Sequence, residues 1–167
     1  MQEKLVFATN NAHKIAEVRA ILGDRRQILS LEEIGCNYEI PETAATIEGN
    51  ALQKARWVSQ RFDCDCFADD TGLEVEVLGG EPGVMSARYA QANGRGGGHV
   101  STADSTLLLE RMDGIANRKA RFRTAIALII AGKETIVEGV VNGSIATAPH
   151  GTDGFGYDPL FIPEGET

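Results

Sequence analysis

Two long β-prone runs meet at a turn in the stretch RFRTAIALIIAGKETIVEGVVNGSI (Arg121–Ile145). β-branched residues are frequent in both runs, mainly Ile in the first and Val in the second, and such residues favour strands. Gly132 and Lys133 separate the runs, and a glycine-containing pair in this position is typical of a β-hairpin. The apolar segment Ala125–Ala131 suits a buried strand and is far shorter than the roughly 20 residues that span a bilayer. The stretch therefore predicts a late hairpin and argues against an integral membrane protein.

Strand and helix patterns alternate upstream of this hairpin. The segment KLVFA (Lys4–Ala8) is β-prone, and apolar residues at helical spacing follow from Ala12 to Gly23. A second helix is predicted near Ala51–Phe62 and a third over Thr102–Met112. Helices between early strands, followed by a hairpin, indicate an α/β or α+β fold around one sheet. We see no linker or repeat, so residues 1–167 are expected to form a single domain.

A pair of aspartates lies between the second and third helices. Cys66–Ala68 reads as a brief buried strand that ends at a turn over residues 69–72, and Leu73–Val77 alternates apolar and acidic residues like a half-exposed strand. Adjacent carboxylates can supply oxygen ligands to Mg²⁺ or a general base, although neighbours in a strand point to opposite faces. An ordinary Asx-type turn before Gly72 is the alternative, and it is the more common explanation of such a pair.

A second candidate is the segment TNNAHK (Thr9–Lys14), where the first strand gives way to the first helix. A helix N-terminus offers unpaired N–H groups and partial positive charge to an anion, and Lys14 adds a cation. The alternative is that Thr or Asn only caps the helix while Lys14 is solvated. The segment contains neither a Walker loop nor a dinucleotide fingerprint.

A third candidate is the glycine-rich segment GTDGFGYDP (Gly151–Pro159). Glycines allow a backbone to approach a ligand closely, Phe155 and Tyr157 could stack on a planar base, and Asp158 could accept hydrogen bonds from it. Glycine-flanked aromatic residues also occur as ordinary turn packing, so this interpretation stays open.

The acidic composition limits the partners of the protein. Sixteen Lys and Arg residues against twenty-four Asp and Glu residues leave a formal charge of −8, which disfavours binding to bulk nucleic acid. An anionic substrate would therefore need a local receptor that overrides the net field. The N-terminus lacks the pattern of a secretory signal, so a cytoplasmic location is expected. Cys36, Cys64 and Cys66 lack the spacing of zinc or redox sites and are expected to be structural thiols.

Several motifs together resemble the inosine/xanthosine triphosphate pyrophosphatase family. They are FATNNAHKIAEV, Glu42 and Glu48 ahead of NALQKA, FADDTGLEVEVLGGEPGVMSARY and GTDGFGYDPLF, and they follow the order of the family from about residue 4 to residue 163. The resemblance implies Mg²⁺-dependent hydrolysis of purine nucleoside triphosphates such as ITP, dITP and XTP to the monophosphate and pyrophosphate, which cleanses the nucleotide pool. It also implies a homodimer and a long mixed sheet, flanked by helices, whose two lobes enclose a central cleft.

The resemblance assigns roles residue by residue. Asp70, Asp69 and Lys14 would be catalytic, and Asp70, Glu42 and Asp69 would hold the metal. The residues implied to bind substrate are Thr9, Asn10, Asn11, Ala12, His13, Lys14, Thr71, Phe155, Gly156, Tyr157 and Asp158. His13 stands where the family often has Gly, and it could crowd the phosphates or donate to them.

The end of the chain also departs from the family pattern. Related sequences usually continue into a C-terminal helix with a Ser-His-Arg motif that contacts the base, whereas this sequence stops at Thr167. We expect such a chain to keep the metal-phosphate site and to lose affinity and purine discrimination. Two alternative functions are a pyrophosphatase for modified pyrimidine nucleotides and a nucleotide-binding module without turnover.

Overall fold

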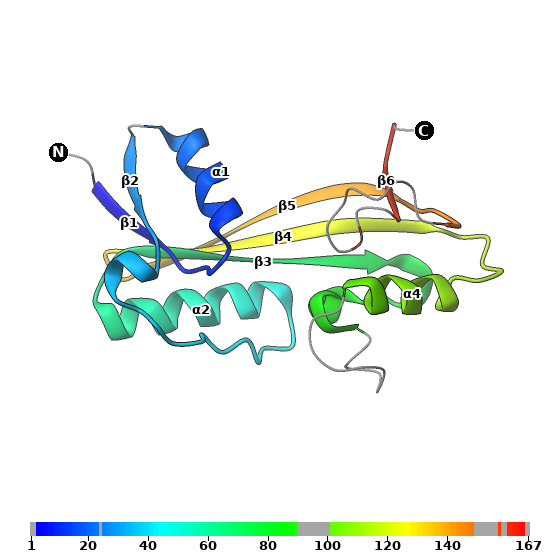
Figure 1. The fold of residues 1–167 in the computed structure, drawn as a ribbon, viewed down its shortest axis with the longest axis horizontal. Helices are drawn as coiled ribbons and strands as arrows, with labels where there is room; N and C mark the ends of the chain where they lie inside the picture. The colour runs from blue at the N-terminus through cyan, green and yellow to red at the C-terminus, as the bar shows by residue number, and fades with distance from the viewer. Residues whose placement is uncertain (1–2, 24, 90–100, 149–156, 158–159, 166–167) are drawn as a thin grey trace. The chain divides into compact units, whose positions relative to one another are not determined.

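The computed structural model describes residues 3–23, 25–89, 101–148, 157 and 160–165 of the chain. Six strands of this part form one mixed sheet in the order β2-β1-β3-β4-β5-β6 (Figure 1). The strands are β1 (Glu3–Phe7), β2 (Arg26–Leu29), β3 (Cys66–Val75), β4 (Lys119–Ile130), β5 (Lys133–Ile145) and β6 (Phe161–Pro163). The α-helices are α1 (Ala12–Leu22), α2 (Ile47–Phe62) and α4 (Ser101–Arg111), and the 3-10 helices are η1 (Glu32–Ile34), η2 (Glu76–Leu78) and η3 (Gly83–Arg88). The predicted α/β class with a long mixed sheet is confirmed.

The chain divides into two compact units. The first contains residues 1–70 and 125–138, and the second contains residues 71–124 and 139–167. Each boundary falls inside a strand, namely β3, β4 or β5. None of the helices in the described part of the chain has the length and apolar character needed to cross a membrane.

The core of the first unit forms around parallel strands. β1 pairs in parallel with both β2 and β3, and Phe7 stacks on Phe67 with ring centroids 4.3 Å apart. Ile15 of α1 joins the same cluster, whereas the buried residues of α2 include Ala55, whose carbonyl accepts a bond from the Cys66 thiol at 3.1 Å. Because strand residues alternate between faces, Phe67 packs with α1 and Cys66 faces α2.

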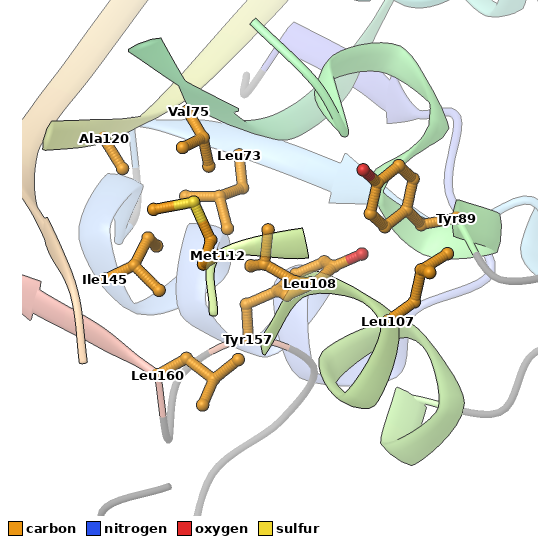
Figure 2. Close-up of a cluster of buried hydrophobic side chains, with 10 residues drawn as sticks. All are labelled: Leu73, Val75, Tyr89, Leu107, Leu108, Met112, Ala120, Ile145, Tyr157 and Leu160. Carbon is orange, nitrogen blue, oxygen red and sulfur yellow. The ribbon is translucent and has the colours of Figure 1, made fainter. Parts of the chain in front are cut away.

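The second unit has its own core (Figure 2). Its buried members are Leu73, Val75, Tyr89, Leu107, Leu108, Met112, Ala120, Ile145, Tyr157 and Leu160. The alternating apolar residues of β3 and the apolar positions of α4 both point into this cluster. The predicted third helix is therefore confirmed, together with the reason for its apolar pattern.

The predicted hairpin is present as β4 and β5. Its turn consists of Ala131 and Gly132, with φ of 52° and 79°, one residue earlier than the predicted pair Gly132-Lys133. Two consecutive residues with positive φ are typical of the type I′ turn, whose twist matches that of the strands.

The prediction of a turn over residues 69–72 is wrong. β3 continues without interruption from Cys66 to Val75, so Asp69 and Asp70 lie inside a strand. Their side chains find partners on neighbouring helices, as described below, which allows two carboxylates to be accommodated in an extended backbone. Val77 is also outside the strand, because it belongs to η2 and is 42% exposed.

The three cysteines carry free thiols. Cys36 and Cys66 are buried, and burial raises the pKa of the Cys66 thiol to about 12. Such a thiol is protonated at neutral pH and unreactive, which agrees with the structural role that the sequence predicts.

Candidate active site

The N-terminus of α1 lies just beyond the carboxyl end of β1. Asn11 is the N-cap, and its side-chain oxygen accepts a hydrogen bond from the Lys14 amide at 3.2 Å. Thr9 Oγ1 accepts from the Asn11 amide at 3.2 Å. By helix geometry the amides of Ala12 and His13 have no partner within α1. The capping role of Asn11 is thus observed, and two N–H groups at this end have a geometry that suits an anion.

Lys14 connects this helix end to β3. Its ammonium group lies 2.8 Å from Asp69 Oδ2, and the Lys14 side chain is 39% exposed while that of Asp69 is 11% exposed. Asn10, Ala12 and His13 are exposed beside it. The solvated Lys14 of the alternative interpretation is therefore not what the structure shows.

Asp70 faces the other side of the sheet. Its Oδ2 accepts a hydrogen bond from Asn50 Nδ2 of α2 at 3.2 Å. The two aspartates thus contact helices on opposite faces, as the alternation of side chains along a strand requires. The structure brings Asp69 together with Lys14, and it brings Asp70 together with α2.

The segment of residues 42–44, called the Glu42 segment below, is also fixed to α2. Glu42 Oε1 lies 2.8 Å from Lys54 Nζ, and the same ammonium donates to the Asp69 carbonyl at 2.6 Å. Lys54 is only 11% exposed although it is charged. One partly buried cation therefore links the Glu42 segment to the backbone of the aspartate pair.

Asn50 and Lys54 have no role in the sequence interpretation, although both belong to the quoted segment NALQKA. Their spacing carries a usable signal, because residues four apart lie on the same face of a helix. A polar pair at this spacing, next to the apolar stripe of Ala51 and Ala55, indicates that this face of the helix packs against polar groups of the protein.

The oxygen ligands present fit a hard divalent cation. Asp70 and Glu42 both contact residues of α2, and Asp69 Oδ1 is buried without a hydrogen-bond partner among the described residues. In the described ranges no three His, Cys, Asp or Glu side chains gather as metal ligands. This arrangement suits Mg²⁺, which often uses one or two carboxylates and completes its coordination with water and substrate phosphates.

The implied base-binding residues are mostly outside the described residues. Phe155, Gly156 and Asp158 fall in this category, as does the segment 90–100. Tyr157 is described: it is 6% exposed, its hydroxyl donates to the Ser86 carbonyl at 2.7 Å, and burial raises the pKa of that hydroxyl well above its ordinary value. Thr71 is exposed, and its hydroxyl lies 2.8 Å from that of Thr124.

Comparison with known proteins fits these features. A model of the Ham1 family matches residues 5–167. The chain belongs to the Ham1 family. Two relatives that bear the name dITP/XTP pyrophosphatase are each 52% identical to this Ham1 chain. The relative from Flavobacterium johnsoniae matches over 163 residues, with 96% of this chain and 81% of the relative covered. The relative from Porphyromonas gingivalis matches over 168 residues, with 99% and 83% covered.

Solved structures of Ham1 proteins share the fold. The Ham1 protein of Staphylococcus aureus superimposes with a TM-score of 0.86 at 34% identity, covering 96% of this chain and 81% of that one. The dITP/XTP pyrophosphatase of Mycobacterium abscessus superimposes with a TM-score of 0.83 at 41% identity, covering 97% of this chain and 84% of that one. The family resemblance stated from the motifs is confirmed.

Proposed function

We propose that this chain hydrolyses non-canonical purine nucleoside triphosphates, dITP and XTP together with ITP, to the monophosphate and pyrophosphate. The observation that carries the proposal is the position of the adjacent aspartates of β3. Asp69 contacts Lys14 at the N-terminus of α1, and Asp70 contacts Asn50 of α2. The names of the relatives at 52% identity support the choice of substrate.

The N-terminus of α1 would receive the phosphates. The Ala12 and His13 amides and the Lys14 ammonium combine N–H donors with positive charge, which suits a polyphosphate despite the net charge of −8. Lys14 is partly exposed, so it can exchange Asp69 for a phosphate oxygen. A small cationic receptor of this kind meets the requirement that the acidic composition imposes.

Asp70 would act with Glu42 on the opposite side of the strand. When bound, Mg²⁺ would neutralise phosphate charge and favour ionisation of a nearby water. Asp70 and Glu42 would hold the metal, and Asp69, on the opposite face of the strand, would hold Lys14 at the end that receives the phosphates. Asp70 would also take the proton of the attacking water as a general base. The stretch Phe155–Asp158 would receive the purine.

We also propose that the chain acts as a homodimer in the cytoplasm. The feature that supports a dimer is the exposed aliphatic surface of β5, where Ile136, Val137, Val140 and Val141 are 42–53% exposed. These side chains alternate between the faces of the strand, with Ile136 and Val140 on one face and Val137 and Val141 on the other, and exposed aliphatic pairs of this kind are typical of an interaction surface.

Pyrophosphate release from a panel of nucleotides tests the proposed activity. We expect dITP, XTP and ITP to release pyrophosphate in the presence of Mg²⁺ and none of them to do so after removal of the metal by EDTA, and the ratio of the rates with dITP and ATP measures the purine discrimination that this chain keeps. No release from dITP, XTP or ITP would contradict the assigned substrate, and full activity in EDTA would contradict the assigned metal.

Substitution of Asp70 tests the assigned catalytic group. We expect Asp70→Asn to lower kcat at least about 100-fold, because the amide can neither take a proton nor balance the charge of the cation. Circular dichroism should show an unchanged fold. Asp113→Asn, which removes an exposed carboxylate in the second unit, is the matched control and should keep wild-type turnover. Wild-type turnover in Asp70→Asn would remove Asp70 from the mechanism.

A further inference from the structure

We infer that Asn50 is a positioning residue that orients the Asp70 carboxylate and ties it to the Glu42 segment, so that both ligands of the divalent cation are held in place before the cation arrives. The inference rests on the proposed function, because it concerns the metal that this function requires. It is carried by the hydrogen bonds and the burial of the Asn50 side chain.

The two bonds of Asn50 determine how its amide is oriented. Its Nδ2 donates to Asp70 Oδ2 at 3.2 Å, and its Oδ1 accepts from the Ala44 amide at 2.8 Å. An ionised carboxylate can only accept a hydrogen bond, and a backbone N–H can only donate one. The opposite orientation of the amide would place its oxygen against the Asp70 carboxylate and its NH₂ group against the Ala44 N–H, and neither pair could form a hydrogen bond. The amide therefore joins Asp70 and Ala44 in one fixed sense.

The position of Asn50 on α2 is otherwise an apolar one. The other buried residues of this helix are Ile47, Ala51, Ala55 and Val58, while Asn50 is 4% exposed. Burial of a side-chain amide costs free energy unless both of its ends are hydrogen-bonded. The bonds to Asp70 and Ala44 offset this cost, and they exist only while both partners keep their present positions.

Further contacts hold the Glu42 segment against the same turns of α2. The Thr43 amide donates to Gln53 Oε1 at 2.8 Å, and Gln53 Nε2 donates to Thr43 Oγ1 at 2.9 Å. Gly49 allows this approach, because a Cβ there would lie 2.9 Å from the Ala44 Cβ and 2.8 Å from Thr46 Oγ1. Gln53 thus fixes the segment through its two bonds to Thr43, whereas Asn50 bonds to both Ala44 and Asp70.

This difference supplies a matched pair of variants. Asn50→Leu and Gln53→Leu each replace a side-chain amide on α2 by an aliphatic group of similar size, and each loses hydrogen bonds to residues 43–44. Only Asn50→Leu also removes the hydrogen bond from Asn50 Nδ2 to Asp70 Oδ2. Binding of Mn²⁺, used as the probe in place of Mg²⁺, can be titrated by electron paramagnetic resonance, both alone and with the α,β-imido analogue of dITP.

We expect Asn50→Leu to weaken Mn²⁺ binding by about 10–100-fold, the usual effect of removing a group that orients a metal ligand. Gln53→Leu should stay within about threefold of the unsubstituted chain, because the Asp70 contact is intact. Turnover should follow the same order, with the loss in kcat larger than any change in KM. If Asn50→Leu does not fold at 15 °C, Asn50→Ser replaces it with the same expectation, since it leaves room for water beside Ala44.

Three results would overturn the inference. They are Mn²⁺ binding by the Asn50 variant within threefold of the unsubstituted chain, equal losses in the Asn50 and Gln53 variants, and no Mn²⁺ binding by the unsubstituted chain in either titration. Failure of the proposed function has a different signature, because it appears as absent pyrophosphate release in the unsubstituted chain whatever residue stands at position 50.

Discussion

Asp69 and Asp70 are neighbours in the chain but have different surroundings. Asp69 pairs with a cation of α1, and Asp70 accepts from an amide of α2. The cause is the two-residue period of a strand, which sends successive side chains to opposite faces. Asp69 is held by a cation of α1, and Asp70 has contacts that include an amide of α2, so the two carboxylates can take different roles in one reaction. At the residue scale, the division of work between them thus follows from backbone geometry.

Lys54 provides a test at the same scale. We expect Lys54→Met to lower kcat/KM at least tenfold, because Glu42 and the Asp69 carbonyl both lose a donor at 2.6–2.8 Å. The free energy of unfolding should fall by about 1–3 kcal/mol, the cost of leaving partly buried polar groups without a partner. Steady-state kinetics and urea denaturation measure the two effects. Lys133→Met, at an exposed position, is the control, and indistinguishable behaviour of the two variants would contradict this role of Lys54.

Sequence patterns predicted the candidate site unevenly at the residue scale. Thr9, Asn11 and Lys14 were identified because a helix N-terminus has a local signature, and the structure places them at that helix end. No local pattern indicates a role for Asn50, because its contacts are with Ala44 and Asp70, which lie 6 and 20 residues away in the chain. Contacts of this kind form only after the sheet and helix have packed, and no local pattern encodes them.

The elements differ in how completely local chemistry determines them. α1 is bounded by Asn11 as its cap and by Gly23 at φ 55°, and both signals stand in the sequence. β3 was expected to break at its aspartates, because acidic residues followed by glycine are common in turns. It continues because Lys14 and Asn50 provide partners for those carboxylates. Tertiary contacts therefore determine that β3 is a continuous strand, although its local sequence favours a turn.

The pairing of β5 with β6 leads to a prediction at the element scale. Gly143 lies opposite Pro163, and a Cβ at Gly143 would clash with the Ile162 carbonyl oxygen. We expect Gly143→Ala to lower the free energy of unfolding by about 1–3 kcal/mol, as overpacking does. Gly139→Ala on the same strand should change it by less than about 0.5 kcal/mol, since nothing lies within 4 Å of that added Cβ. Equal urea midpoints for the two variants would show that β6 is not held as described.

At the scale of the whole molecule, the exposed aliphatic residues of β5 predict the oligomeric state. Sedimentation equilibrium should give the mass of a dimer, and Val137→Glu combined with Val141→Glu should yield monomers by placing charges in an apolar contact. Ile21→Glu changes an aliphatic residue that is 79% exposed on α1 and should leave the dimer intact. A dimer that survives the double substitution would place the interface elsewhere.

The boundaries between the two compact units have a consequence for protein engineering. Chimaeras between related enzymes are usually made by joining segments at loops, where a mismatch between parents costs little. Here the units are joined at residues 70–71, 124–125 and 138–139, all within strands. A hybrid that takes one unit from each of two parents would thus need three crossovers within hydrogen-bonded backbone. Shuffling of Ham1 sequences should be more productive when whole strands are inherited together and the crossovers lie in the helix connections.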